Sequence, residues 1–350
     1  MTIGDPTLRD IHLARQRIAG LAGRTPLIRS AGLSERVGAA VYLKLESLQE
    51  TGSFKIRGAA NKLLSLTAEE RARGVVAVSS GNHGRAVAHV AQQLGVRAVI
   101  CVSERVPAGK VEAIRRLGAE VVVHGASYDE AEAHSLRLQA ERGLTRVDPF
   151  DDPAVIAGQG TVGLELLEDL PQVDTVVVPL SGGGLIAGIA VALKAANPAI
   201  RVIGTSMDRA PVMVHSLRAG RPLELPEEDT LADALAGGIG LDNRYTFRLV
   251  QRYVDEALLV SEDEIAGAMV FALEQERLVV EGGGAVALAA ALYGKVTEPG
   301  RTVAVVISGG NVDLPLLCSL SAFAPPPRGE AAVQCHPQGG RAGGWGNLPQ

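Results

Sequence analysis

The sequence predicts an α/β protein of two domains, each built around a parallel-sheet βαβ core. Its 350 residues correspond to two domains at roughly 150 residues each. Short apolar runs alternate along the chain with longer segments of helical periodicity, which is the order of βαβ units. Hydrophobic residues make up 47% of the chain and aromatic residues only 3%, and this composition suits buried parallel strands.

Eight short apolar segments are predicted to be strands. Their carboxyl ends are expected to meet at one edge of each sheet, where ligands of such folds bind. The eight segments are residues 40–45, 75–78, 97–102, 120–124, 175–179, 201–205, 256–260 and 302–307.

Seven longer segments between these strands are predicted to be helices. Ser261 followed by Glu264 is a capping-box pattern that starts the last of them. The seven segments are residues 56–65, 86–94, 110–117, 128–142, 155–170, 185–196 and 265–276.

The turn-rich sequence DPFDDP at residues 148–153 predicts a crossing between domains. We assign residues 1–50 plus 151–323 to a large domain and residues 51–150 to a smaller one. Residues 324–350 are rich in proline and glycine, so we expect a disordered tail there.

Composition excludes several classes of protein. The net charge of −5 gives no reason to expect nucleic acid or a membrane surface as a partner. Cys101, Cys318 and Cys335 are too few and too widely spaced for a disulfide framework or a zinc site, so reduced thiols and a cytoplasmic location are expected. No signal peptide or apolar stretch of membrane-spanning length is apparent.

Lys55 lies in the segment GSFKIR, between a predicted strand and the start of a predicted helix. The positive end of the helix dipole and nearby Arg57 would both favour the neutral amine that attacks an aldehyde. For a lysine considered alone, a solvated side chain beside a helix start is the commoner interpretation. Its companion motifs decide between the two.

Two turns with small residues follow predicted strands. Their backbone N–H groups and side-chain donors suit a carboxylate or a ring hydroxyl, although ordinary tight turns explain each of them as well. The first consists of Ser79, Ser80, Gly81, Asn82, His83 and Gly84, and the second is SGGNVD, which begins at Ser308.

A glycine-rich turn follows the strand at residues 175–179 and precedes a helix. Glycines let the backbone approach a phosphate, and the helix N-terminus supplies a favourable field. The spacing fits neither a Walker A loop nor a dinucleotide fingerprint, so a compact phosphate site is the remaining interpretation. The turn consists of Ser181, Gly182, Gly183, Gly184 and Leu185.

One lysine, a phosphate site and two turns lined by serine and asparagine indicate a small phosphorylated carbonyl compound. Pyridoxal 5′-phosphate (PLP), carried as a Schiff base on Lys55, fits this description. The protein is therefore predicted to be an enzyme.

The same motifs resemble the serine/threonine dehydratase family of fold type II PLP enzymes. The resemblance covers residues 10–322 and rests on the order and spacing of all the motifs together. In this family PLP lies in the cleft between the two domains. The motifs are residues 24–27 (RTPL), 53–59 (SFKIRGA), 79–84 (SSGNHG), 158–161 (GQGT), 181–185 (SGGGL) and 308–313 (SGGNVD).

The resemblance implies a role for each motif. Lys55 would bind PLP and move the Cα proton, beside Phe54, while Asn82 would bond the ring hydroxyl. Residues 181–185 would hold the phosphate, and Ser308 would meet the pyridine nitrogen.

The substrate would lie at the turn 79–84. Ser79, Ser80, Gly81, Asn82 and His83 are its expected contacts, with Ser80 and His83 near the substrate carboxylate. Ser80 also matches the second base of racemases in this family.

The implied reaction is α,β-elimination from a β-hydroxy α-amino acid such as threonine or serine, which gives a 2-oxo acid and ammonia. The expected partner is thus a small amino acid, and a homo-oligomer is expected.

Three departures from the family pattern bear on this expectation. Ser206 replaces a metal-binding glutamate, so no metal is expected, and Ala234 replaces a glycine in a loop that borders the substrate. The sequence also shows no regulatory domain after the catalytic region, so allosteric inhibition by isoleucine is not expected. Residues 206–209 and 231–247 are similar to the hydroxyectoine-utilisation branch, which would imply a hydroxylated diamino acid as substrate.

Three alternatives for the function, and the role of Glu281, remain open at this stage. Ser80 opposite Lys55 would suit an amino-acid racemase, and a non-catalytic PLP or amino-acid binder would keep the fold without the chemistry. Elimination from a different β-substituent, such as that of phosphoserine or cysteine, is a third. Glu281 faces the active site or caps a helix.

Overall fold

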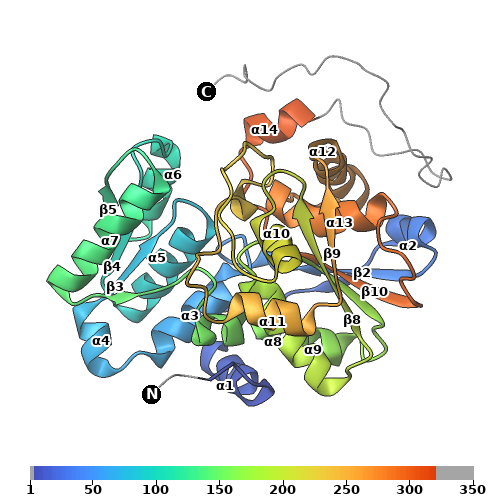
Figure 1. The fold of residues 1–350 in the computed structure, drawn as a ribbon, viewed down its shortest axis with the longest axis horizontal. Coiled ribbons are helices and arrows are strands. Elements are labelled where there is room, and N and C mark those ends of the chain that lie inside the picture. The colour runs from blue at the N-terminus through green and yellow to red at the C-terminus, as the bar shows by residue number, and fades with distance from the viewer. Residues whose placement is uncertain (1–3, 321–350) are drawn as a thin grey trace.

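The computed structural model describes residues 4–320, which form two sheets with helices on both faces of each (Figure 1). The larger sheet has six strands in the order β1-β2-β10-β7-β8-β9, all parallel to their neighbours except β1 against β2. Its strands are β1 (Leu27–Arg29), β2 (Ala40–Leu45), β7 (Thr175–Pro179), β8 (Arg201–Met207), β9 (Glu256–Val260) and β10 (Thr302–Ile307).

The smaller sheet has four parallel strands in the order β5-β4-β3-β6. Since β3 and β4 are covered on both faces, their side chains are uniformly buried and apolar. The strands are β3 (Val75–Val78), β4 (Ala98–Val102), β5 (Glu120–Val123) and β6 (Thr145–Arg146).

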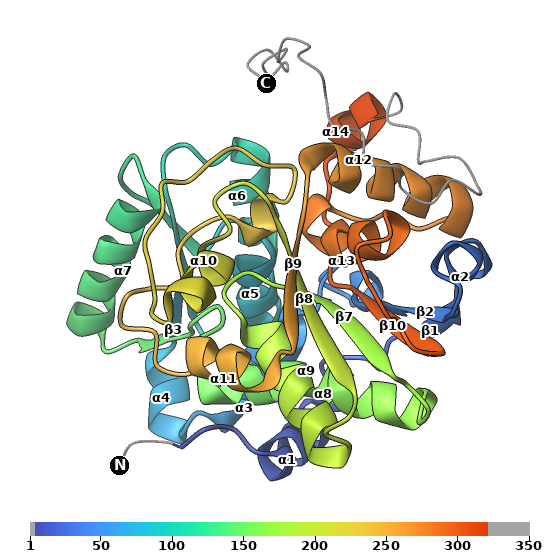
Figure 2. The same ribbon diagram turned by 45° about the vertical axis from the view of Figure 1, so that its right-hand side comes forward.

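Helices bury both faces of the larger sheet, as Figure 2 shows. One apolar core lies beneath α1 (Leu8–Ile18), α8 (Pro153–Asp169), α9 (Gly184–Ala196), α10 (Val212–Ala219) and α11 (Thr246–Tyr253). The core on the opposite face lies beneath α2 (Ala31–Val37), α12 (Glu262–Phe271) and α13 (Gly282–Leu292).

The smaller sheet is covered in the same way. Helices α3 (Lys55–Ser65), α5 (Asn82–Leu94) and α6 (Ala108–Arg116) pack on one face, and α7 (Tyr128–Arg142) packs on the other. The remaining short elements are α4 (Ala68–Arg73), α14 (Leu314–Ser319), the 3₁₀ turns η1 (Glu46–Leu48) and η2 (Asp233–Leu235), and the π turn η3 (Ala272–Glu276).

The eight predicted strands are all present, with ends that differ by at most two residues. The capping box of Ser261 and Glu264 is also confirmed. The last predicted helix, residues 265–276, is helical throughout, but α12 ends at Phe271 and residues 272–276 form a π-helix. Helix α13 had no predicted counterpart, since three glycines at its start are typical of a loop.

The domain boundaries at residues 50 and 150 stay a prediction, although all four strands of the smaller sheet lie between them. The tail predicted for residues 324–350 lies outside the described residues. No helix within residues 4–320 has the length and apolar character needed to cross a membrane.

Candidate active site

A cavity of about 1530 Å³ lies where the loops after β3, β7 and β10 meet the start of α3. Its walls come from both sheets, because β3 belongs to the smaller sheet and the other two strands to the larger one. Every predicted site residue lines this cavity: Phe54, Lys55, Ser79, Ser80, Gly81, Asn82, His83, Ser181, Gly182, Gly183, Gly184, Leu185 and Ser308.

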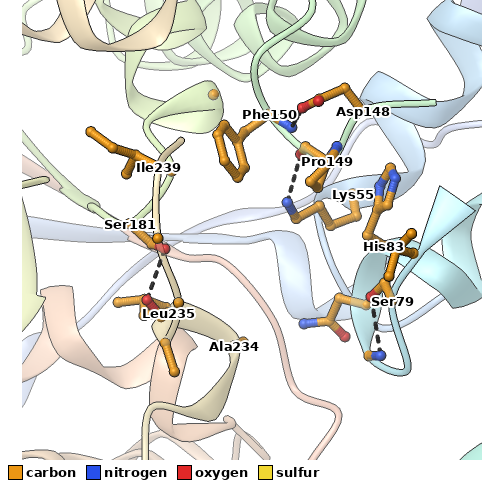
Figure 3. Close-up of a pocket in the computed structure, with 18 of the residues that line it drawn as sticks. Lys55, Ser79, His83, Asp148, Pro149, Phe150, Ser181, Ala234, Leu235 and Ile239 are labelled. Atoms are coloured by element: carbon orange, nitrogen blue, oxygen red, sulfur yellow. Dashed lines mark hydrogen bonds between the residues drawn. The ribbon is translucent and has the colours of Figure 1, made fainter. Parts of the chain in front are cut away.

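Lys55 is the first residue of α3 and reaches into the cavity (Figure 3). Its Nζ donates a hydrogen bond of 2.8 Å to the carbonyl oxygen of Pro149 and lies 5.2 Å from the centroid of the Phe54 ring. Pro149 belongs to the turn-rich segment in which the sequence indicated only a domain crossing. The structure shows that this segment also holds the amine of Lys55.

Burial lowers the pKa of the Lys55 amine to about 8, against the opposing charges of Asp148 and Glu281. The lowered pKa agrees with the prediction of an amine that is easily neutral, but of the two predicted causes Arg57 is wrong, and the effect of the helix dipole stays a prediction. Desolvation is the dominant effect, and the guanidinium of Arg57 is not involved because it binds Glu46 and Glu165 in the protein interior.

The glycine turn after β7 leads directly into α9. Gly183 has φ +87°, a left-handed conformation that a residue with a Cβ adopts at a cost, and it precedes the helix without any side-chain cap. The first N–H groups of α9 are therefore left for an anion in the cavity. Ser181 Oγ donates to the carbonyl of Leu235, which fixes the beginning of the turn (Figure 3).

Phe150 packs against this turn from the neighbouring segment. A Cβ on Gly182 would lie 2.3 Å from the Phe150 ring, and a Cβ on Gly184 would lie 3.0 Å from Phe150 atoms. These two glycines are thus required for packing. The sequence offered no signal for Phe150, because its partner glycines lie more than 30 positions away in the chain.

The turn after β3 is held by its own hydrogen bonds. Gly81 N donates to Ser79 Oγ over 3.2 Å, and Ser80 lies beside them, half-buried. His83 borders the cavity but is only 4% exposed, and its Nε2 lies 2.9 Å from the carbonyl oxygen of Val147. Burial and the charge of Lys55 lower the pKa of His83 to about 3, so the ring is neutral and donates to that carbonyl.

Ser308 and Asn82 present polar groups to the cavity. Ser308 Oγ is buried, and its one hydrogen bond within residues 4–320 is a long contact of 3.4 Å to the carbonyl oxygen of Gly283. Asn82 Nδ2 donates one of its two N–H groups to Glu281 Oε1 over 2.6 Å. The other N–H group is not used in this bond. Glu281 was left between two interpretations by the sequence, and the structure places it in the cavity wall.

A buried charge network beneath the site was missed entirely. Arg57 binds the carboxylates of Glu46 and Glu165, and Lys44 Nζ lies 2.6 Å from Glu165 Oε2. Arg57 and Lys44 are at most 1% exposed. The only available signal was the placement of charged residues within apolar segments, which does not indicate how they pair.

These residues fit PLP. The uncapped glycine turn at the start of α9 suits the phosphate, and the weakly bonded hydroxyl of Ser308 suits the pyridine nitrogen. The neutralisable amine of Lys55 suits the aldehyde.

Comparison with known proteins gives a consistent result. The family model described as pyridoxal-phosphate dependent enzyme matches residues 18–309. An L-threonine ammonia-lyase of Thermotoga maritima is 49% identical over 89% of this chain and 77% of its own length.

Solved structures agree with this match. Maize serine racemase superimposes with a TM-score of 0.86 and 38% identity, covering 90% of this chain and 97% of its own. The processed form of threonine deaminase isoform 2 from Solanum lycopersicum gives a TM-score of 0.84 and 35% identity, covering 93% of this chain and 97% of its own.

Proposed function

Since this chain belongs to the pyridoxal-phosphate dependent enzymes, we propose that it is an ammonia-lyase that converts threonine into a 2-oxo acid and ammonia. The fold is that of the fold type II PLP enzymes, and PLP is its cofactor. The observation that carries the proposal is the single cavity that joins the amine of Lys55, the glycine turn and Ser308.

Bound PLP supplies an electron sink that acidifies the substrate Cα–H bond. Lys55 Nζ would take up the Cα proton, because its lowered pKa lets it exchange a proton near neutral pH. The Cβ–O bond breaks and the hydroxyl group leaves with one proton, so that the elimination releases water. The carbonyl of Pro149 aims this amine across the cavity. The N–H groups at the start of α9 hold the phosphate, and Ser308 accepts or donates one hydrogen bond at the pyridine nitrogen.

The decisive experiment measures ammonia and 2-oxo acid formed from L-threonine and L-serine by the wild type and by Lys55→Ala. The variant is expected to lose roughly 10³-fold or more of the activity, since it lacks the group that moves the proton. It is also expected to lose the visible absorbance of the bound cofactor. Absorbance that persists in Lys55→Ala would contradict the assignment of Lys55.

A racemase is the second candidate. Ser80 lines the same cavity as Lys55, and the maize protein of similar structure is a serine racemase. The same incubations, analysed for D-serine and D-threonine, separate the two activities. Dominant formation of the D-enantiomer would replace the lyase assignment.

A hydroxylated diamino acid is a further candidate substrate. Four acidic side chains line the part of the cavity formed by residues 224–242, and the three of them other than Asp233, which pairs with Lys110, would attract a second ammonium group. These are Glu224, Glu227, Asp233 and Asp242. The preferred substrate is found by comparing kcat/KM for threonine, serine, 3-hydroxyaspartate and 3-hydroxy-2,4-diaminobutyrate.

We also propose that the enzyme works in the cytoplasm as a homo-oligomer. Leu48, Val279 and Leu314 are large apolar side chains that are 57%, 48% and 69% exposed, and contact with a second copy would cover such groups. Light scattering after gel filtration measures the oligomeric state directly.

A further inference from the structure

Glu281 immediately precedes α13, and the sequence left open whether it caps that helix. Its side chain makes no capping hydrogen bond, and the residue is only 5% exposed. The carboxylate turns instead toward the turn after β3, where Oε1 accepts from Asn82 Nδ2 over 2.6 Å. Oε2 accepts from the backbone N of Asn311 over 3.2 Å.

Asn311 fixes the orientation of the Asn82 amide from the other side. Asn311 Nδ2 donates to Asn82 Oδ1 over 2.6 Å and to the carbonyl oxygen of Thr51 over 2.8 Å. Asn82 Oδ1 is thus an acceptor, and Asn82 Nδ2 must be the atom that faces Glu281. One N–H of Asn82 is used by Glu281, and the other remains to donate toward the cavity.

The surrounding backbone is shaped to admit this group of three side chains. A Cβ on Gly309 would lie 2.1 Å from Glu281 Oε1, and a Cβ on Gly52 would lie 2.4 Å from Asn311 Oδ1. Gly52 also has φ +76°. Two glycines in separate segments therefore leave the space that the network occupies.

The network joins the two sheets across the cavity. Asn82 begins α5, directly after β3 of the smaller sheet, whereas Asn311 follows β10 of the larger sheet and Glu281 precedes α13, which packs on it. The orientation of the Asn82 amide is therefore set by residues from the opposite wall. Without them the amide would be free to turn its oxygen toward the cavity.

We propose that Glu281, as a carboxylate, is the positioning residue that holds Asn82 as a hydrogen-bond donor to the ring oxygen of PLP. This inference rests on the proposed function, because it assigns the partner of Asn82 to the cofactor. Glu281 itself does not touch the reacting atoms; it acts through Asn82.

The charge of Glu281 matters because both of its neighbours are donors. A protonated carboxyl has an O–H that needs an acceptor, and Asn82 Nδ2 and Asn311 N offer none. Loss of the charge therefore removes one bond of the network and leaves the Asn82 amide held by Asn311 alone.

Burial raises the pKa of Glu281 to about 7, opposed by the hydrogen bonds from Asn82 and Asn311. The charged groups that act on it are Asp233 from η2, Lys110 from α6 and Lys55 from α3. Lys110 Nζ lies 3.2 Å from Asp233 Oδ2, so these two charges largely cancel. The network is expected to weaken as the pH falls through about 7.

The test compares Glu281→Gln and Glu281→Asp with the wild type as holoenzymes. Glu276→Gln is the matched control, because Glu276 accepts a hydrogen bond from Ser30, the N-cap of α2, and does not line the cavity. Three quantities are measured from about pH 6 to 9: kcat for L-threonine, KM for L-threonine, and the visible absorbance of the bound cofactor.

We expect the wild type to lose kcat below about pH 7 and to show an absorbance change there. Glu281→Gln should lower kcat roughly 10- to 100-fold with little change in KM, and should lack both pH transitions. Glu281→Asp keeps the charge on a shorter side chain, so it should retain a transition and recover part of kcat. Glu276→Gln should match the wild type.

A wild-type kcat and an unchanged acid transition in Glu281→Gln would overturn the proposal. If Glu281→Gln does not retain the cofactor, Glu281→Asp decides: a retained transition supports the proposal, and its absence overturns it. Failure of the wild type to act on threonine would refute the substrate assignment alone. The absorbance titration would still test Glu281, since it needs no turnover.

Discussion

Replacement of Arg57 by methionine is the sharpest test of how the site is supported. Arg57 lies two residues after Lys55 and is 1% exposed. Its guanidinium donates five hydrogen bonds: two to Glu46 at 2.7 and 2.8 Å, two to Glu165 at 2.6 and 2.9 Å, and one to Thr161 at 3.0 Å. Arg57→Met would leave two buried carboxylates with Lys44 as their remaining cation.

The magnitude follows from the burial of these charges. Removal of one partner from a buried ion pair costs about 3–5 kcal/mol, because the other charge is left without compensation. We expect the free energy of unfolding of Arg57→Met to fall by about this amount at pH 8. Guanidinium titration followed by far-ultraviolet circular dichroism measures it, since the single tryptophan, Trp345, lies outside the described residues.

The pH dependence has a definite sign. Burial opposes ionisation of Glu46, but the charge and hydrogen bonds of Arg57 prevail and keep its pKa below the usual 4.5. Glu46 therefore stabilises the wild type above pH 4.5, and this stability is lost as the pH falls through its lowered pKa. In Arg57→Met burial dominates and raises that pKa, so the deficit of the variant should widen from pH 5 to pH 8.

Two comparisons make the reasoning refutable. Arg57→Met combined with Glu46→Leu leaves the pair of Lys44 and Glu165 balanced. The loss of unfolding free energy in the double variant should therefore be smaller than the sum of the losses in the two single variants, by about 1–3 kcal/mol. Arg24→Met breaks the exposed pairs of Arg24 with Glu168 and Asp169 and should cost less than about 1 kcal/mol. A loss below about 1 kcal/mol in Arg57→Met, or additive losses in the double variant, would refute the argument.

Three further predictions concern the cavity itself. The rate at which PLP-free protein takes up PLP should rise with pH through about 8, because the neutral fraction of Lys55 grows there. Stopped-flow absorbance measures this rate, and a rate that stays constant from pH 7 to 9 would contradict the prediction. Gly183→Ala should raise the Kd for PLP about 10-fold, because φ +87° is strained for alanine and its Cβ would lie 3.0 Å from Met213 Cε. Titration with PLP, followed by absorbance, measures this Kd. An unchanged Kd would show that the turn does not hold the phosphate. Ionisation of buried Glu281 lowers the free energy of unfolding, by at most about 3 kcal/mol, as the pH rises from 4.5 to about 7. The Tm of Glu281→Gln should therefore increase relative to that of the wild type from pH 5 to 8. A difference in Tm that does not depend on pH would argue against the raised pKa of Glu281.

The sequence was sufficient to predict eight of the ten strands in residues 4–320, and to select the Lys55 segment and the glycine turn that line one cavity. Each depends on residues that are neighbours in the chain: an apolar run forms a strand, and a glycine run before a helix forms an anion site. Strands β1 and β6 are too short to show a recognisable strand pattern in the sequence. Helix α13 was not predicted because it begins with three glycines, which are typical of a loop. Local patterns therefore predicted most of the strands and the three turns that meet at the cavity, but not most of the residues that line it.

Only the tertiary structure decided how these pieces act on one another. Lys55 and the Pro149 carbonyl are 94 residues apart in the chain, and Asn82 and Glu281 are 199 residues apart. The pKa of Lys55 depends on how completely the cavity excludes water, and no property of the segment GSFKIR contains that information. The sequence by itself determined which groups the protein carries and at which strand ends they lie. Packing of the two sheets determined their charge, their orientation and their partners, because burial and hydrogen bonding between distant segments exist only once the chain has folded.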